Sequence, residues 1–183
     1  MNIINTEISG VFVAETTPFV DHRGAFSRIY CDRDLAKVIG ERRIVQINHS
    51  RTDTVGAVRG MHCQQGPYAE MKLIRCIKGK VWDVALDLRC GSRTFLKWHA
   101  EEISSSNCKI IVIPEGCAHG FQVLEPASEL LYMHTAFYEP KAEFGVRYDD
   151  PAVDILWPLP PVDLSQRDLS HLFLTDDYQG IVL

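Results

Sequence analysis

Short apolar runs recur along this chain at steady intervals, and each run is about as long as a β-strand. Turn-forming stretches rich in glycine, serine and charged residues separate them. Most runs alternate in part between apolar and polar positions, as a strand with one buried face does. The pattern predicts an antiparallel all-β fold, either a sandwich or a barrel. The runs are GVFVAE, RIVQIN, AVRGMHCQ, MKLIRCI, VWDVALDL, KIIVIP, HGFQVLE and ELLYMHTAFY.

Two segments depart from this pattern and are typical of short helices. Residues 32–40, DRDLAKVIG, have an aspartate near the start and a glycine at the end, as helices often do. Residues 164–173, LSQRDLSHLF, offer Ser165 as an N-cap. We therefore expect a few short helices beside the strands.

Strand alternation also indicates which faces could carry chemistry. In VWDVALDL, Asp83 and Asp87 share the face opposite the large apolar residues. In MKLIRCI, Lys72 shares a face with Ile74 and Cys76. A lysine on such a face points either into a cavity or outward from an edge strand, and this strand alone does not separate the two.

Composition narrows the class of protein. With 183 residues and 46% hydrophobic content, the chain is expected to form one domain over residues 1–183. A formal net charge of −5 argues against a nucleic-acid partner but allows a local basic pocket for a phosphorylated ligand. No apolar run approaches the roughly 20 residues of a membrane span, and MNIINTEISG lacks the features of a signal peptide.

Six cysteines are present, and none forms a CxxC pair. Cys76 and Cys108 lie inside apolar runs, where a free cysteine behaves as a small hydrophobic residue. We expect a reducing, cytoplasmic setting rather than a disulfide scaffold.

The run AVRGMHCQ is unusual because Arg59 and His62 interrupt apolar, strand-like material. Strict alternation would put positions 59 and 62 on opposite faces of a strand. Gly60 lies between them and could permit a bulge that turns both side chains inward. We therefore expect an irregular strand that lines a polar pocket.

The segment PEGCAHG, residues 114–120, resembles the second sequence motif of the cupin superfamily. Gly56 and His62 keep the G-x5-H spacing of the first motif, but Gln64 replaces its second histidine and the expected glutamate is missing. His62 and His119 alone would make a poor site for a divalent ion. The resemblance implies a double-stranded β-helix, or jelly roll, whose metal pocket has become an organic site, with no metal and no cofactor.

A fuller resemblance covers roughly residues 10–170. Eight segments in order are similar to those of the nucleotide-sugar 3,5-epimerases typified by dTDP-4-dehydrorhamnose 3,5-epimerase. Each segment is weak alone, but the ordered set is specific. The segments are FVDHRGAF, QINHS, VRGMHCQ, MKLIRCIKGKVWDVALDLRCGSRTFLKW, IPEGCAHGFQVL, LLYMHTAFY, DDPAVDILWP and LSQRD.

This resemblance implies an isomerase that acts on a nucleotide-linked 4-keto-6-deoxyhexose. The ketone at C4 acidifies the hydrogens on C3 and C5, and returning a proton to the opposite face inverts the carbon. Such a site needs a base, an acid on the other face and a positive charge near the enolate oxygen. By resemblance, His62 is the base, Asp168 its carboxylate partner, Tyr132 the acid and Lys72 the cation.

The resemblance also assigns the binding residues. Those expected to contact the sugar are Gln46, Asn48, Arg59 and His119, and those expected near the diphosphate are Tyr138 and Arg167. Arg23 and Phe26 belong to a segment that reaches the nucleotide, often from the neighbouring subunit of the family. A homodimer with exchanged N-terminal strands is therefore expected. His22, His49, His134 and His171 receive no role beyond packing or surface exposure.

Several positions depart from the family pattern. Arg28 stands where a glutamate is usual, Cys63 where an aromatic residue is usual, and Met133 and Ala136 replace polar residues after the tyrosine. An arginine only donates hydrogen bonds whereas an ionised glutamate only accepts them, so Arg28 could favour a CDP-linked sugar over a dTDP-linked one.

Other functions remain open at this point. An epimerase that inverts C3 alone would keep the same base and acid. A cupin metal oxygenase lacks support because the ligand set is incomplete. A sugar-binding cupin without activity would not require the acid–base set of His62, Asp168 and Tyr132.

Overall fold

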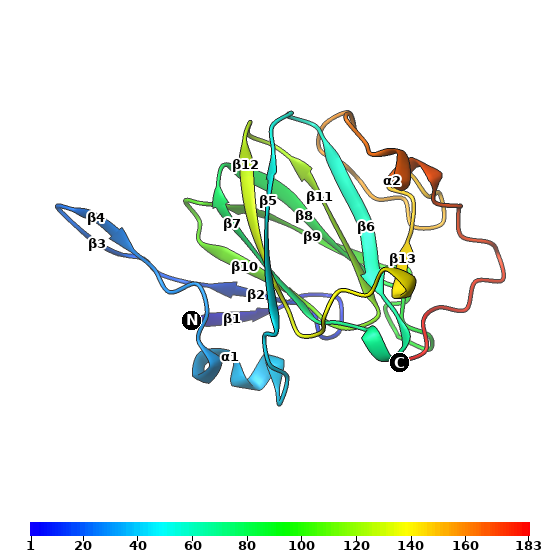
Figure 1. Cartoon of the computed structure of the whole chain (residues 1–183), viewed down its shortest axis with the longest axis horizontal. Helices are drawn as coiled ribbons and strands as arrows, with labels where there is room; N and C mark the ends of the chain where they lie inside the picture. Colours follow the sequence, from blue (N-terminus) through cyan, green and yellow to red (C-terminus); the bar gives the residue numbers. More distant parts are fainter.

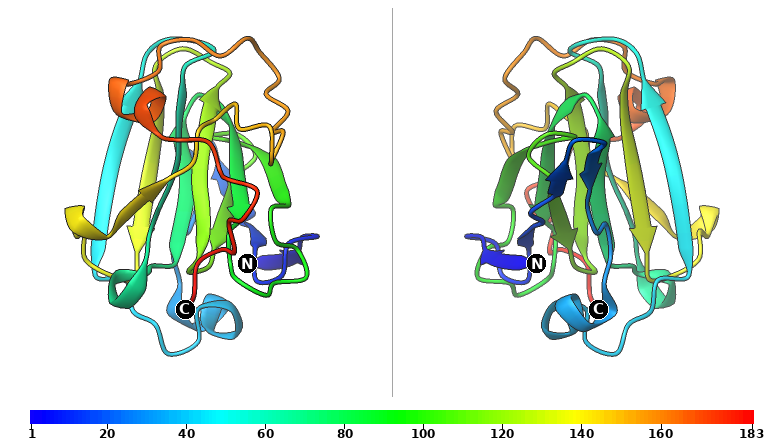
Figure 2. Two further views of the ribbon diagram at one scale, coloured as in Figure 1. Left: turned by 90° about the vertical axis from the view of Figure 1, so that its right-hand side faces the viewer. Right: turned by 90° about the vertical axis from the view of Figure 1, so that its left-hand side faces the viewer.

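The computed structural model describes all 183 residues, and its strands form two large facing sheets and one separate hairpin (Figures 1 and 2). All strand pairs are antiparallel. The six-stranded sheet has the spatial order β1 (Asn2–Asn5), β2 (Phe12–Glu15), β10 (Lys109–Ile113), β7 (Lys72–Lys78), β12 (Ser128–His134) and β5 (Gln46–Thr52). The five-stranded sheet has the order β13 (Glu143–Gly145), β6 (Val58–Gln64), β11 (Cys117–Val123), β8 (Lys80–Asp87) and β9 (Trp98–Ser104). The predicted all-β class is confirmed.

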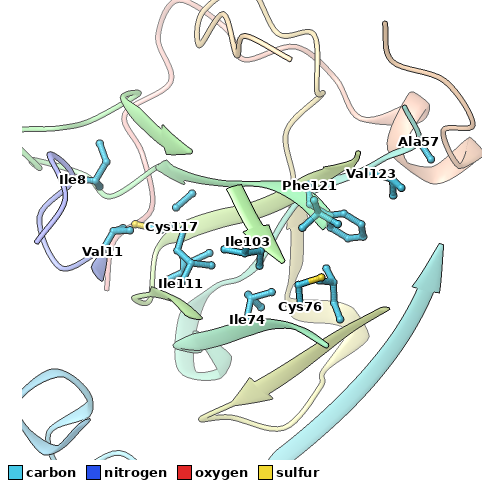
Figure 3. Packing of buried hydrophobic residues seen from close by; sticks show 14 residues of the cluster. Ile8, Val11, Ala57, Ile74, Cys76, Ile103, Ile111, Cys117, Phe121 and Val123 are labelled. Carbon is cyan, nitrogen blue, oxygen red and sulfur yellow. The ribbon is translucent and has the colours of Figure 1, made fainter. Parts of the chain in front are cut away.

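The main core lies between the sheets, and further apolar layers cover both outer faces. Figure 3 shows the inner layer, in which Ile74, Ile111 and Phe121 are almost fully buried. Ile110 and Val112, which alternate with Ile111 along β10, belong instead to the outer layer against the helix α1 (Asp32–Ile39). Burial on both faces explains why KIIVI reads as a continuous apolar run.

Two short α-helices accompany the sheets, with 3₁₀ turns at Gly66–Tyr68 and Pro140–Ala142. The helix α1 has acidic residues in its first turn and ends at Gly40, which has a positive φ of 59°. This matches the helix predicted over 32–40. The helix α2 (Gln166–Ser170) is shorter than the predicted segment 164–173, but Ser165 caps it by accepting the backbone N–H of Asp168. Neither α-helix has the length and hydrophobicity that a membrane span requires.

A separate hairpin of β3 (Phe19–Asp21) and β4 (Gly24–Phe26) extends away from the two sheets (Figure 1). The side chains of Phe19 and Phe26 are paired across it, and 73% and 76% of their surface is exposed. Large apolar side chains at such an exposed position are typical of a surface that another molecule covers.

The strand β6 carries the irregularity that the sequence predicts. Along its pairing with β11, His62 lies opposite His119 and Arg59 lies opposite Phe121, so three steps on β6 match two on β11. This bulge brings positions 59 and 62 to the same face of the sheet. Gly60 has a φ of +132°, and its backbone lies close to that of Gly120.

Replacing Gly60 should therefore destabilise the fold. A Cβ at this position would lie 2.5 Å from the Cα of Gly120 and 2.9 Å from the His119 carbonyl oxygen, and both are backbone atoms. Gly24 has a similar φ of +140° but no atom within 4 Å of the same position, so it is a matched control for the backbone cost alone. We expect Gly60→Ala to lower the free energy of unfolding by about 1–3 kcal/mol more than Gly24→Ala. Equal losses in urea denaturation would contradict this.

Candidate active site

One polar cavity of about 300 Å³ opens between the two sheets. Its walls are alternating inward positions of neighbouring strands, because successive side chains of a strand point to opposite faces. The residues that contribute are Gln46, Asn48 and Ser50 on β5, Arg59, His62 and Gln64 on β6, Lys72 on β7, His119 and Phe121 on β11, and Tyr132 and His134 on β12. Tyr138, Glu143 and Arg167 lie at its mouth.

His62 and Asp168 form a close pair at one side of this cavity. The Nε2 atom of His62 lies 2.8 Å from Oδ1 of Asp168, and the backbone N–H of Gly60 donates to Oδ2 at 3.2 Å. Burial alone would raise the pKa of Asp168, but these hydrogen bonds and the neighbouring imidazole outweigh it and hold the pKa well below its usual range. Asp168 is therefore an ionised acceptor, and the proton of neutral His62 is on Nε2.

The guanidinium of Arg167 lies beside this pair. Its Nη2 atom is 3.1 Å from Nε2 of His62, and its Nη1 atom is 3.2 Å from the Glu143 carboxylate. About half of the Arg167 side chain remains exposed. Its Nε atom also pairs with the buried Asp168, 3.4 Å from Oδ1. Arg167 thus places a positive charge at the edge of the cavity, between the carboxylates of Glu143 and Asp168.

Tyr132 lies on the facing sheet. Its hydroxyl is 2.9 Å from Oγ of Ser50, and its ring meets the ring of His119 edge-on at 5.9 Å. Burial raises the pKa of Tyr132 to about 12. The phenol therefore keeps its proton at neutral pH and can donate it.

Lys72 points into the cavity, so the inward alternative for this lysine is the correct one. Its ammonium donates to the carbonyl oxygen of His62 at 3.0 Å and forms an ion pair with Glu70 at 3.2 Å. The side chain is only about one-tenth exposed. A positive charge therefore lies next to the backbone of the residue that carries the imidazole.

His119 is more deeply embedded than the sequence suggests. Its Nε2 atom contacts both carboxylate oxygens of Asp83, at 3.0 and 2.9 Å, and both residues are buried. Burial raises the pKa of Asp83, and the His119 imidazole opposes that shift. The inner face of β8 thus holds a carboxylate whose partner is His119, so only part of the His119 ring is available to a ligand.

Three residues of the predicted site do not reach this cavity within the chain. Arg23 and Phe26 lie on the exposed hairpin, where Arg23 pairs with Asp21 at 2.6 Å. Arg28 follows the hairpin and pairs with Asp34 at 3.0 Å. These three side chains therefore cannot contact a ligand in the cavity of their own chain, and only the cavity of another subunit is open to them.

His134 and His171 were expected only to pack or to lie at the surface, but both lie next to predicted site residues. His134 bonds to the buried Glu70 at 2.8 Å, two positions along β12 from Tyr132. Because residues two positions apart on a strand share a face, the assignment of Tyr132 to the site could have indicated that His134 faces the same cavity. The ring of His171 lies 5.9 Å from that of His62, and no sequence pattern indicated this.

One group of side chains beside the cavity has the composition of a metal site. Ligand atoms of His62, Asp168 and His171 lie within 4.8 Å of one another. The Arg167 guanidinium stands against His62 within the same group, and its positive charge opposes a second cation there. The arrangement fits proton transfer better than metal binding.

Comparison with known proteins agrees with this geometry. The family model described as dTDP-4-dehydrorhamnose 3,5-epimerase matches residues 5–176. A relative with that name from Shigella flexneri is 40% identical over 180 residues, covering 97% of this chain and 99% of that protein.

Solved structures of similar proteins share the whole fold. The epimerase from Legionella pneumophila, in complex with dTDP-4-keto-L-rhamnose, has a TM-score of 0.91 and 36% identity, covering 100% of this chain and 98% of that one. A 3′-monoepimerase from Streptomyces bikiniensis, in complex with dTDP-quinovose, has a TM-score of 0.85 and 27% identity over 92% of this chain and 85% of that one. The predicted resemblance is confirmed, and the chain belongs to the dTDP-4-dehydrorhamnose 3,5-epimerase family.

Proposed function

We propose that this protein epimerises a nucleotide-linked 4-keto-6-deoxyhexose by removing a proton beside the ketone and returning one to the opposite face. The observation that carries the proposal is the placement of a histidine–carboxylate pair and a buried phenol on facing sheets of one cavity. His62, which is held by Asp168 of α2, lies at one wall, and Tyr132 lies at the other. This is the geometry that inversion at carbon requires.

His62 is the proposed base. Because its Nε2 atom donates to the ionised Asp168, its Nδ1 atom is left as the unprotonated nitrogen. The proton on the substrate carbon passes to Nδ1, and the C–H electron pair moves into the enolate. Asp168 stabilises the resulting imidazolium and fixes the orientation of the ring, as the aspartate of a catalytic triad does.

Tyr132 is the proposed acid. Its raised pKa keeps the hydroxyl protonated until the enolate carbon accepts the proton from the face opposite His62. The Lys72 ammonium is the proposed electrostatic partner of the oxygen that gains negative charge. After product release, solvent removes the proton from His62 and returns one to Tyr132, so no cofactor is consumed.

The remaining pocket residues are proposed to bind the substrate. Gln46, Asn48, Arg59 and His119, which line the cavity, are proposed to contact the sugar, and Tyr138 and Arg167 at its mouth are proposed to lie near the diphosphate. The Arg59 and Arg167 guanidinium groups suit a diphosphate, because two exposed cations match its negative charge.

We propose dTDP as the nucleotide. The relatives and the ligands in two similar structures carry this name. A CDP-linked sugar would rely on the Arg28 guanidinium as a hydrogen-bond donor to the base, and in this chain Arg28 pairs instead with Asp34 at 3.0 Å.

The alternative of inversion at C3 alone keeps support from one relative, because the Streptomyces bikiniensis protein is a 3′-monoepimerase. Both reactions use one base and one acid. They differ in which carbons pass through an enolate, so labelling of C3 and C5 separates them.

We further propose that the chain acts as one domain in a cytoplasmic homodimer. The exposed Phe19 and Phe26 on the hairpin would be covered by the second subunit, and Arg23 and Phe26 would then reach its nucleotide.

The first prediction concerns the base. Incubation of the protein with a dTDP-4-keto-6-deoxyhexose in heavy water should place deuterium at C3, and at C5 if both centres are inverted. His62→Asn and Asp168→Asn should slow this exchange by about 10²–10⁴-fold, because proton abstraction loses its base or the support of that base. NMR of the sugar measures the label, and circular dichroism verifies the fold. A folded His62→Asn variant with normal exchange would exclude the mechanism.

The second prediction concerns the acid. Tyr132→Phe should slow inversion more than exchange, because His62 still forms the enolate but the opposite face lacks its donor. Deuterium should therefore enter the recovered substrate faster than the epimer accumulates. Equal slowing of both rates, or no slowing, would contradict the assigned role of Tyr132.

The third prediction concerns the hairpin. An Arg23→Ala/Phe26→Ala double variant and the His62→Asn variant should each be weakly active alone. Refolded together, they should recover about a quarter of the wild-type activity, since each mixed dimer has one intact site. A mixture of His62→Asn and Asp168→Asn is the control and should recover nothing, because both defects lie in the same cavity wall. Absence of recovery in the first mixture would show that the hairpin does not complete the partner's site.

A further inference from the structure

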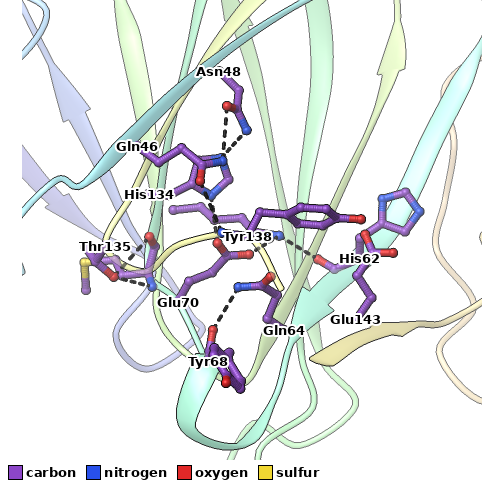
Figure 4. Close-up of polar contacts among 12 residues, drawn as sticks. Gln46, Asn48, His62, Gln64, Tyr68, Glu70, His134, Thr135, Tyr138 and Glu143 are labelled. Carbon is purple, nitrogen blue, oxygen red and sulfur yellow. Dashed lines mark hydrogen bonds and ion pairs between the residues drawn. The ribbon is translucent and has the colours of Figure 1, made fainter. Parts of the chain in front are cut away.

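Glu70 and His134 lie in the cavity but have no part in the proton transfers described above. Both side chains are about one-tenth exposed or less, and they are joined by a contact of 2.8 Å between Nδ1 of His134 and Oε2 of Glu70. Figure 4 shows that this pair lies between Asn48 and the strand that carries His62. A buried carboxylate and an imidazole at this position need a physical explanation.

Hydrogen bonds connect the pair to the mouth of the cavity on one side. The backbone N–H of Tyr138 donates to Oε1 of Gln46 at 3.1 Å. The side-chain amide of Gln46 then donates to Oδ1 of Asn48 at 3.2 Å, and the amide of Asn48 lies 3.3 Å from Nε2 of His134.

On the other side, the pair reaches the proposed catalytic groups. The second carboxylate oxygen of Glu70 lies 3.2 Å from Nζ of Lys72. The same ammonium donates to the carbonyl oxygen of His62 at 3.0 Å. A continuous chain of hydrogen bonds, with the Glu70–Lys72 ion pair as one link, therefore runs from the backbone of Tyr138 to the backbone of His62 (Figure 4).

The direction of this chain is fixed at both ends. A backbone N–H and an ammonium can only donate, and an ionised carboxylate can only accept. The Tyr138 N–H therefore orients the Gln46 amide with its oxygen toward Tyr138, and this orients the Asn48 amide with its NH₂ toward His134. Every donor then meets an acceptor only if His134 accepts at Nε2 and donates from Nδ1 to Glu70.

Glu70 is ionised in this arrangement. Burial would raise its pKa, but the hydrogen bond from His134 and the charge of Lys72 outweigh burial and lower it. Both carboxylate oxygens are engaged, one by each partner. Glu70 can therefore hold the Lys72 ammonium in one place only while His134 holds Glu70.

We propose that Glu70 and His134 are positioning residues, which hold the Lys72 ammonium at the reacting oxygen, and that the chain fixes His134 as its Nδ1–H tautomer. The kinetic part of this inference rests on the proposed epimerase function, whereas the tautomer does not. Gln64 hydrogen-bonds to the backbone of Phe137 and Glu139 on either side of Tyr138. The backbone at the mouth of the cavity is therefore held independently of His134 and Glu70. The effect is therefore expected on kcat more than on KM.

The tautomer can be measured without substrate. Two-dimensional NMR of ¹⁵N-histidine-labelled protein at neutral pH distinguishes a protonated ring nitrogen from an unprotonated one, and His134→Gln identifies the signal. We expect protonated Nδ1 and unprotonated Nε2 at His134. A proton on Nε2, alone or together with Nδ1, would overturn the proposed direction. Since no substrate is present, this result is independent of whether the protein is an epimerase.

Two substitutions at His134 test the positioning. Glutamine can still accept from Asn48 and donate to Glu70, whereas leucine fills similar space and does neither. We expect His134→Leu to lower kcat by about tenfold or more while changing KM by less than about threefold, and His134→Gln to keep kcat within about threefold of the wild type. His99→Leu is the control, because His99 also lies beside a glutamate but on β9, outside the cavity.

Glu70→Gln tests the other member of the pair. This substitution should lower kcat in the same way. The kcat of the Glu70→Gln/His134→Leu double variant should be no lower than that of the less active single variant, because both residues act through Lys72. Wild-type kcat in His134→Leu, or additive losses in the double variant, would overturn the inference. Thermal denaturation of each variant separates these effects from a general loss of stability.

Discussion

The contact between His62 and Asp168 depends on a change of strand register at Gly60. Without the bulge, Arg59 and His62 would lie on opposite faces of β6, and only one of them could enter the cavity. With it, the two side chains share the inner face, and the Gly60 N–H is free to donate to Asp168 at 3.2 Å. The same backbone irregularity therefore orients the imidazole and helps to keep its carboxylate partner ionised.

The interior of the fold is divided between an apolar half and a polar half of the same two sheets. Ile74 and Ile111 fill the first, while polar inward positions of β5, β6 and β12 fill the second. Burial of charge in the polar half is tolerated because each group has a partner: Asp83 has His119, and Glu70 has His134 and Lys72. The buried charges of the pocket are thus paired with one another, while the imidazole of His62 stays accessible and the phenol of Tyr132 stays protonated.

Much of the architecture could be read from the sequence because strand period and turn chemistry are local properties. The strands, the helix over 32–40 and the irregularity at Gly60 follow from residues within a few positions of one another. The pairing of Glu70 with His134 joins positions 64 residues apart and left no local signal. The surroundings of the hairpin were likewise not predictable from the strand pattern, since Phe26 is exposed although it is apolar, and Arg28 pairs with Asp34 of α1.

The long separation of the histidine–carboxylate pair has a consequence for the order in which the protein matures on the ribosome. Asp168 follows His62 by 106 residues, and every strand of both sheets has been synthesised before it. The sheets can begin to pair while the chain is still being made, since folding proceeds from the N-terminal side during synthesis. Pairing of the sheets can therefore begin before Asp168 has been synthesised, and the imidazole of His62 meets its anionic partner only when the segment that contains α2 docks.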